Sequence, residues 1–595
     1  MENRLQDLGP KKYIESLLMS IVGHFQLTEV SFTVEHPGEL AHGDYATNIA
    51  LVCAKKMGKS PREVADSIVS EFQKLADPEI IGTVTVAGPG FINITLTSHY
   101  FASEIKTIFS QKEKYGHSDR LAGQTWVIEH TSPNPNKAMH LGHLRNNLTG
   151  MSISNIALSQ GVRVIRDEVD NNRGIAIAKL MWGYLKFARK DGNLEKTDVS
   201  YWHDHQNEWK EPKDENLRPD RFVDQLYVKG ADDFKNPEIE SYVRDYVVRW
   251  EAGNPLIWDL WKTVLQYSYE GQSLTLKRLG NHWDHVWYEH EHYQKGKDLV
   301  EQGLSQGIFR IGEGGAIVTD FRDDKLPDTV LIKSDGTSLY LTQDIALTKL
   351  KRETYHADKL FWVIGPEQSL ALRQLFRVCN QLGIGSESDY THLSYGYMSI
   401  LRNGVIEKMS SRMGNVIYID DLIDMVKSVV LLKLKDPQDS LAEQVALGAV
   451  KFAILFTGRQ TDTAFDIDRA TNLDGDSGPY LQYTHARILS MISKGSEQGI
   501  IPLYHDGREK PSDIERTLYR FPEVVAMALD EYAPNHIATY LIELARTFNS
   551  FYAAHKIIDK ENLELSSHRL ALAQATSLIL KNGLNLLGIH APDRM

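Results

Sequence analysis

The chain has 595 residues, of which 42% are hydrophobic and 24% charged, and its net charge is −13. This composition excludes a wholly disordered chain, and the length predicts roughly three or four domains. The negative charge argues against a general nucleic-acid-coating protein, although a local basic face can still bind one specific nucleic acid.

Cysteine content and apolar patterning exclude further classes. Only two cysteines occur, Cys53 and Cys379, so we expect neither a disulfide framework nor a thiolate zinc site. No apolar run reaches the ~18 residues of a membrane span, and the acidic side chains among residues 1–23 are unlike a signal peptide. We therefore expect a cytoplasmic protein with no membrane or DNA partner.

The first 120 residues predict a separate α+β module. Ser60 followed by Pro61 is typical of a helix N-cap and first helical position. The other predicted elements of this module are helices over 11–25 and 46–57, strands over 83–86 and 91–96, and a linker over 111–123.

From 121 to 425 the pattern changes to apolar strands followed by helices, which is typical of an α/β fold with a parallel sheet. The polar, tryptophan-containing segment 193–236 is interpreted as an insertion at the sheet edge. Predicted strands cover 125–130, 163–169, 359–364 and 393–401.

The last part of the chain, 426–595, has almost continuous helical periodicity, which predicts an all-α bundle. Its clearest predicted helices cover 445–456, 480–494, 537–551 and 568–587.

Two short motifs predict a nucleotide site. The first, His140-Leu141-Gly142-His143, follows the strand at 125–130, so a helix start would present backbone N–H groups to a phosphate, and Gly142 would leave room for a base. The second, Lys408-Met409-Ser410-Ser411, offers a cation and two hydroxyls from a distant loop. Taken separately, the histidines could instead be metal ligands or surface helix residues, and the second motif an ordinary surface loop.

Together the motifs resemble the two signatures of class I aminoacyl-tRNA synthetases, and their surroundings resemble the arginyl-tRNA synthetases. The supporting segments are 42–48, 132–137, 335–344, 478–483 and 587–595. The resemblance implies an N-terminal tRNA-contacting module at 1–120, a Rossmann-like catalytic domain at 121–425 and a helical anticodon-binding domain at 426–595.

The resemblance also implies a reaction. The carboxylate of L-arginine attacks the α-phosphorus of ATP, and the terminal adenosine of tRNA(Arg) then receives the arginyl group. ATP would bring Mg²⁺ held by phosphates and water, so no protein-bound metal is expected. We expect a monomer.

The family's functional residues map onto named positions. The ATP site would comprise His140, Gly142, His143, Lys408, Met409, Ser410 and Ser411. The arginine site would comprise Ser132, Asn134, His143, Glu289, Tyr340, Asp344 and Gln368, with Glu291 as a rival to Glu289. Contacts with tRNA would come from Phe91, Asn93, Tyr480, Tyr483 and Met595, although these tyrosines could equally be core residues. Asp344 could alternatively cap a helix that begins near Ile345.

One position departs from the family pattern. The second signature usually has a lysine where this chain has Ser411, which is followed by Arg412. A hydroxyl cannot replace a cation, and arginyl enzymes without that lysine use one upstream of the first signature, here Lys137. We therefore predict His140, His143, Lys408 and Lys137 as the catalytic residues.

Three other functions remain open at this point: another class I synthetase, an adenylyl transferase, or a non-catalytic tRNA-binding relative. The missing zinc knuckles and the short insertion argue against the first. The helical bundle argues against the second, and the intact signature residues argue against the third.

Overall fold

A computed structural model describes residues 9–195, 198–322, 325–402, 405–408, 416–434, 436–506 and 510–595. The chain packs as two units, which are described separately. One comprises Met1–His117, Leu434–Gly448 and Asn472–Met595, and the other Ser118–Lys433 and Ala449–Thr471.

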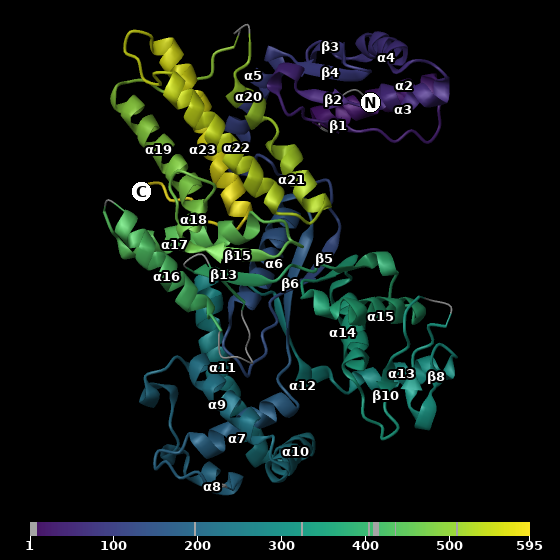
Figure 1. Ribbon diagram of the computed structural model, residues 1–595, viewed down its shortest axis with the longest axis vertical. Helices are drawn as coiled ribbons and strands as arrows, with labels where there is room; N and C mark the ends of the chain where they lie inside the picture. Colours follow the sequence, from purple (N-terminus) through teal and green to yellow (C-terminus); the bar gives the residue numbers. More distant parts are fainter. Residues whose placement is uncertain are drawn as a thin grey trace. The chain divides into compact units, whose positions relative to one another are not determined.

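The N-terminal part of the first unit is an antiparallel sheet packed against helices, as predicted (Figure 1). The strand order is β1 (Val34–Glu35), β2 (Tyr45–Thr47), β4 (Phe91–Leu96) and β3 (Ile81–Ala87). The helices are α2 (Pro10–His24), α3 (Ile49–Met57) and α4 (Pro61–Leu75). Ser60 is the N-cap of α4, because its side chain accepts a hydrogen bond from the Glu63 N–H.

The C-terminal part of the same unit is a helix bundle, as predicted for most of 426–595. Residues 449–471 of that range instead belong to the second unit and include the strand β15 (Thr463–Asp466). The helices of the bundle are α5 (Ser98–Gln111), α19 (Gly478–Glu497), α20 (Asp513–Leu518), α21 (Phe521–Asp530), α22 (Asn535–Ala554) and α23 (Leu563–Leu586). Helix α17 (Asp439–Leu455) begins in this unit. Across the described chain, no helix is both long and apolar enough to cross a membrane.

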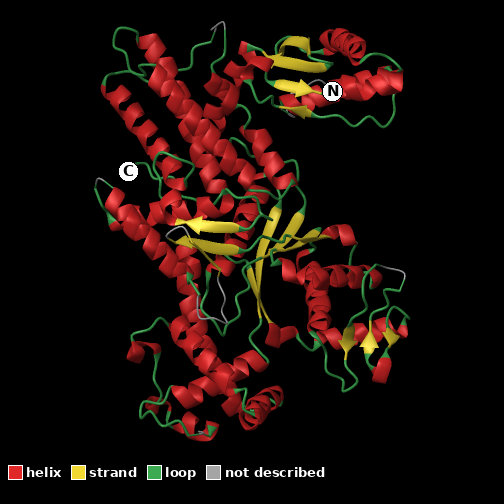
Figure 2. Cartoon of the chain, viewed as in Figure 1, coloured by secondary structure: helices red, strands yellow, loops and turns green. Residues whose placement is uncertain are grey.

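The second unit contains a five-stranded parallel sheet, which confirms the predicted α/β class (Figure 2). The strand order is β12 (Tyr390–His392), β11 (Lys359–Trp362), β5 (Thr125–Glu129), β6 (Arg163–Asp170) and β7 (His285–Tyr288). The predicted strands at 125–130, 163–169 and 359–364 are confirmed as β5, β6 and β11.

The prediction that 393–401 belongs to this sheet is wrong. The neighbour of β11 is β12, and β13 (Met398–Arg402) instead lies between β14 (Val405–Lys408) and β15 (Thr463–Asp466) in a second sheet. The partner strand β15 lies far along the chain, so an apolar pattern alone does not reveal which sheet β13 joins.

Two further groups of elements complete this unit. A small antiparallel sheet has the order β10 (Val330–Ile332), β9 (Ile317–Val318) and β8 (Arg310–Ile311). The remaining helices outside the β6–β7 connection are α6 (Leu141–Ser159), α12 (Glu289–His292), α13 (Lys295–Ser305), α14 (Tyr340–Tyr355), α15 (Ser369–Gln381), α16 (Ile419–Lys433) and α18 (Ile467–Ala470).

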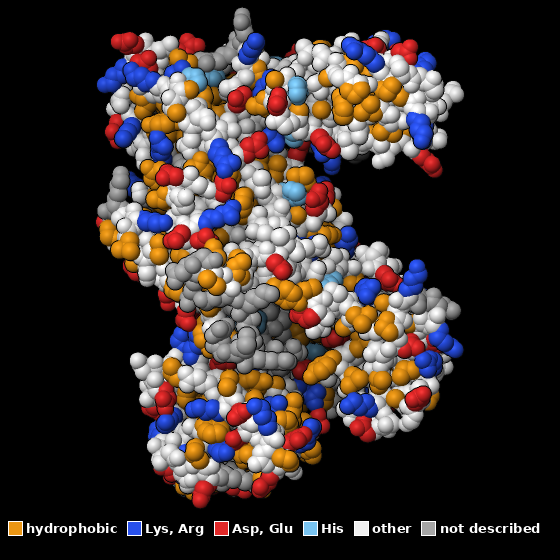
Figure 3. Space-filling model, viewed as in Figure 1, with side chains coloured by type: hydrophobic (Ala, Val, Ile, Leu, Met, Phe, Trp, Pro, Cys, Tyr) orange, Lys and Arg blue, Asp and Glu red, His pale blue; other side chains and the backbone are white. Residues whose placement is uncertain are grey.

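A helical subdomain lies in the connection between β6 and β7. It comprises α7 (Ile175–Phe187), α8 (Val199–Asp204), α9 (Pro219–Asp233), α10 (Pro237–Glu251) and α11 (Pro255–Leu279). The segment interpreted as an insertion, 193–236, thus forms one part of a larger helical region. Its Trp202 and Trp209 are fully buried in the shared core of the subdomain. On the face shown in Figure 3, acidic and basic side chains are interspersed.

Candidate active site

The candidate site begins at the carboxyl end of β5, where ligands usually bind in parallel α/β sheets. After β5 the chain turns through Thr131 and Ser132, whose φ angles are +73° and +34°. The Ser132 hydroxyl oxygen accepts a hydrogen bond from the Val169 N–H at 3.1 Å. This bond fixes the loop after β5 to the end of β6.

His140 and His143 cap the start of α6. The Nδ1 atom of His140 accepts from the Gly142 N–H, and Nδ1 of His143 accepts from the His140 N–H, both at 3.1 Å. Because each Nδ1 is an acceptor, the proton of each neutral ring lies on Nε2. The predicted strand, turn and helix start is therefore confirmed, and the caps determine the tautomer of both histidines.

Both imidazoles are held uncharged. Burial and the Lys137 charge lower the pKa of His140 to about 4. Burial, His140 and Lys137 lower the pKa of His143 to about 3. At neutral pH the histidines can therefore offer Nε2–H donors to a phosphate but add no positive charge.

The position of Gly142 leaves little room for a side chain next to the cap. A Cβ atom at this position would lie 3.0 Å from Cε1 of the His140 ring. Any larger residue would therefore displace the ring that accepts the Gly142 N–H. This packing reason for a glycine is independent of the expectation that Gly142 leaves room for a nucleotide base.

Lys137 lies close to the two histidines, since its charge lowers the pKa of both rings. Its ammonium is 5.5 Å from the centre of the Tyr227 ring, within the range of a cation–π contact. Lys137 is only partly buried, so its ammonium is accessible to a ligand.

The chain that follows the second motif pairs directly with the first. The Leu141 N–H donates to the Ile417 carbonyl at 3.1 Å, and the Ile419 N–H donates to the Met139 carbonyl at 3.2 Å. The backbone of Lys408 ends β14. The described part of the structure does not include the Lys408 side chain or the residues Met409, Ser410, Ser411 and Arg412.

Carboxylates gather at the ends of β5, β6 and β7. The buried Lys351 ammonium on α14 lies 2.8 Å from Glu129 and 2.9 Å from Asp167. Burial raises the pKa of Glu168 to about 8, and the neighbouring charges of Asp170, Asp167 and Glu129 add to this shift. The region is poor in positive charge relative to its carboxylates, and a cationic ligand would correct that imbalance.

The two carboxylates expected to bind arginine belong to this group. Desolvation by the surrounding protein and the charges of Glu129 and Glu289 raise the pKa of Asp344 to about 7, and Lys351 opposes the shift. The residue itself is exposed. Burial raises the pKa of Glu289, and Arg173 partly offsets the shift. Glu289 is buried whereas Glu291 is exposed, so the geometry favours Glu289. Helix α14 begins at Tyr340 with Leu339 as its N-cap, so Asp344 does not cap the helix.

Three other expected arginine contacts are exposed to solvent. Tyr340 is one helical turn before Asp344 on α14, and its ring is 80% exposed. Asn134 is exposed, and its carbonyl accepts from the Gln272 amide at 3.2 Å. Gln368 is also exposed, at the end of a short 3₁₀ turn (Pro366–Gln368).

The expected tRNA contacts lie in the first unit. Phe91 is 42% and Tyr483 39% exposed. The Tyr480 hydroxyl instead accepts from the Asn549 amide at 2.8 Å. Asn93 and Met595 are half-buried.

Sequence reasoning missed Arg145. Its buried guanidinium donates to the carbonyls of Gly396, Gly458 and Arg459 and to the Thr463 hydroxyl, at 3.0–3.1 Å. It thereby joins α6 to the sheet that contains β14. An arginine within an otherwise buried helix was the available signal.

Comparison with known proteins places this arrangement in a family. The description "tRNA synthetases class I (R), catalytic domain" matches residues 104–467, and "Arginyl tRNA synthetase N terminal domain" matches 11–96. The description "DALR anticodon binding domain" matches 481–595.

Relatives extend the match over nearly the whole chain. The arginine–tRNA ligase of Treponema denticola is 34% identical over 574 residues, which cover 93% of each chain. That of Bacteroides fragilis is 31% identical over 586 residues, covering 93% of this chain and 94% of the relative. The fold matches arginyl-tRNA synthetase from Thermus thermophilus with a TM-score of 0.77 at 22% identity, over 98% and 100% of the two chains. This chain belongs to the arginyl-tRNA synthetase family of class I aminoacyl-tRNA synthetases.

Proposed function

We propose that this enzyme attaches L-arginine to tRNA(Arg) through an arginyl-adenylate, at the carboxyl ends of β5, β6 and β7. Family membership implies this reaction. The observation that supports the location is the excess of carboxylates around Glu289 and Asp344, in the same unit as the histidine-capped start of α6.

The phosphate half of the site would use backbone and imidazole donors. ATP phosphates would lie at the start of α6, where His140 and His143 present Nε2–H groups and the helix dipole favours negative charge. Lys408, Met409, Ser410 and Ser411 would close over the phosphates from the second loop, and Gly142 would face the nucleotide.

Lys137 would stabilise the negative charge that develops on the phosphates during the reaction. As the arginine carboxylate attacks the α-phosphorus and pyrophosphate leaves, negative charge accumulates on the phosphate oxygens, and a positioned cation lowers that barrier. Lys137 is the cation placed beside both histidines, and it would compensate for the neutral Ser411.

Mg²⁺ would arrive with ATP. By resemblance to the family, the cation would be held largely by phosphates and water, which suits its preference for retained waters.

The arginine half would use charge recognition. Glu289 and Asp344 would accept from the guanidinium, whose planar fork of donors matches carboxylates. Tyr340 would cover the side chain, while Ser132, Asn134, His143 and Gln368 would hold the α-amino and carboxylate groups.

The first unit would bind tRNA. Within the anticodon-binding domain, Tyr480, Tyr483 and Met595 would contact bases, for which aromatic stacking is the usual mode. Phe91 and Asn93 of the N-terminal module would contact another part of the tRNA. We propose domains at 1–120, 121–425 and 426–595, with a monomeric, cytoplasmic enzyme.

ATP–pyrophosphate exchange with each amino acid, with and without tRNA(Arg), tests the proposal. We expect exchange with arginine alone and only when tRNA is present. Citrulline, the neutral isostere of arginine, should be rejected by orders of magnitude because the carboxylates would lack a cation. Comparable use of citrulline would contradict the proposed pocket.

A further inference from the structure

Asp170 is a buried carboxylate to which the family resemblance assigns no role. It is the last residue of β6 and its side chain is 3% exposed. Among the described residues no cation pairs with it, and the Tyr269 hydroxyl is the side-chain donor that acts on its carboxylate. Buried carboxylates are normally hydrogen-bonded or paired with a cation. The Asp170 carboxylate therefore has acceptor capacity left for donors of a bound ligand.

The surroundings of Asp170 contain the expected arginine-binding carboxylate. In the sheet Asp170 lies opposite Tyr288, the residue immediately before Glu289. Burial raises the pKa of Asp170 to about 7, and the Glu289 charge contributes to the shift, while the Tyr269 hydroxyl opposes it. Glu289 is thus close enough to influence the ionisation of Asp170.

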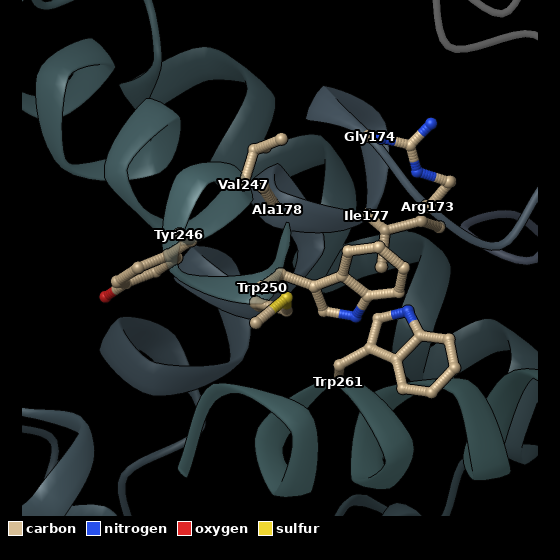
Figure 4. Close-up of a pocket in the computed structure, with 9 residues that line it drawn as sticks. Arg173, Gly174, Ile177, Ala178, Tyr246, Val247, Trp250 and Trp261 are labelled. Carbon is tan, nitrogen blue, oxygen red and sulfur yellow. The ribbon is translucent and has the colours of Figure 1, made fainter. Parts of the chain in front are cut away.

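Glu289 already has a guanidinium near it. Arg173 lies 3.6 Å from the Glu289 carboxylate and also pairs with Glu251. Its guanidinium is 3.8 Å from the centre of the Tyr293 ring. Arg173 lines the same pocket as Trp250 and Trp261 (Figure 4).

Glu289 would therefore be shared between the Arg173 side chain and the guanidinium of a bound arginine substrate. A guanidinium carries five N–H donors, more than one shared carboxylate can accept. Asp170 lies opposite Tyr288, the residue before Glu289. Its carboxylate has acceptor capacity beyond the Tyr269 hydroxyl, so it can accept the remaining donors.

We propose that Asp170 is a third carboxylate of the arginine site and binds the substrate guanidinium together with Glu289 and Asp344. This inference rests on the proposed location of arginine. It differs from the family's expected set of contacts, which does not include this position.

Asp170→Asn tests the inference, because it keeps the shape of the side chain and removes its charge. A hydrogen bond between charged groups is lost, so we expect the KM for arginine to rise by about 10- to 100-fold. The KM for ATP should stay unchanged, and the preference for arginine over citrulline should narrow by a similar factor. Asp245→Asn, an exposed carboxylate on α10, is the matched control and should change none of these values.

Two measurements separate the outcomes. Calorimetric titration of arginine into each variant reports binding directly, and the melting temperature reports folding. An unchanged arginine affinity in Asp170→Asn, whether or not its melting temperature falls, would overturn the inference and leave Asp170 as a structural partner of Tyr269. Failure of the unmodified enzyme to activate arginine would instead refute the proposed function.

Discussion

Replacing Lys351 by methionine should destabilise the unit that contains the parallel sheet by about 3–5 kcal/mol, the usual cost of breaking a buried ion pair. Methionine preserves the length and apolar contacts of the side chain but leaves Glu129 and Asp167 without the ammonium that lies 2.8 and 2.9 Å from them. The Trp287 indole N–H still donates to Asp167 at 2.9 Å. Because Asp167 keeps this hydrogen bond, we expect the loss of stability to be that of one broken ion pair, the pair with Glu129, rather than that of two.

The loss should depend on pH in a definite direction. Burial, with a contribution from Asp167, raises the pKa of Glu129 even with Lys351 in place, and removing the cation raises it further. A carboxyl group whose folded-state pKa exceeds its unfolded value holds its proton more tightly in the folded protein, so stability falls as pH rises between the two values. The defect of Lys351→Met should therefore be smaller at pH 5 than at pH 8.

Urea unfolding at both pH values, followed by tryptophan fluorescence and circular dichroism, measures this effect. Lys349→Met, a half-exposed lysine on the same helix, is the control. Adding Glu129→Gln should restore part of the lost stability, because it removes one of the two uncompensated charges. The reasoning fails if Lys351→Met matches Lys349→Met at pH 8, or if its defect grows at pH 5.

Arginine affinity should rise with pH, because a carboxyl of pKa about 7 at Asp344 is roughly 10% ionised at pH 6 and roughly 90% at pH 8, which gives an apparent gain of about tenfold. Calorimetric titration should also detect proton release. Asp344→Asn should reduce the pH slope and leave the part that comes from Asp170, whose pKa is also raised to about 7; an unchanged slope in that variant would assign the titration elsewhere. His140→Asn should keep the helix cap but lose the Nε2–H donor, so adenylate formation should fall about 10²–10³-fold. The melting temperature of His140→Asn should stay above that of His140→Ala, and equal values would argue against the cap. Lys137→Ala should reduce the rate of arginine-dependent pyrophosphate exchange much more than Arg412→Ala does, and the reverse order would transfer the charge-compensating role to Arg412.

The local sequence pattern predicted the strand and the helix start that form the proposed phosphate site. The strand at 125–130 and the helix that starts at His140 depend on neighbouring residues, since each capping bond joins positions two or three apart. The Ser60 N-cap and the C-terminal helices were also predicted correctly, because they too depend on residues that are close in sequence. Sheet membership failed for 393–401, because β13 pairs with β15 rather than β11.

The acidic side of the site was harder to predict because its pairs join distant parts of the chain. Lys351 bonds to Glu129, which is 222 positions away, and no spacing rule connects them. The resemblance pointed to Glu289 and Asp344 but not to Lys351, Asp170 or Arg173. Buried charges within otherwise apolar strands and helices were the visible signal, and their partners required the three-dimensional structure.

The two halves of the site have opposite electrostatic requirements, and the histidine tautomers reconcile them. A protonated imidazole at the start of α6 would attract the same carboxylates that we propose for the arginine guanidinium. The low pKa values of His140 and His143 prevent this while preserving an N–H donor on each ring. The positive charge for adenylate formation must then come from a side chain outside the capped helix start. Lys137 meets that condition, so in our proposal the charge missing at Ser411 is supplied from the opposite side of the phosphates without adding a cation to the arginine pocket.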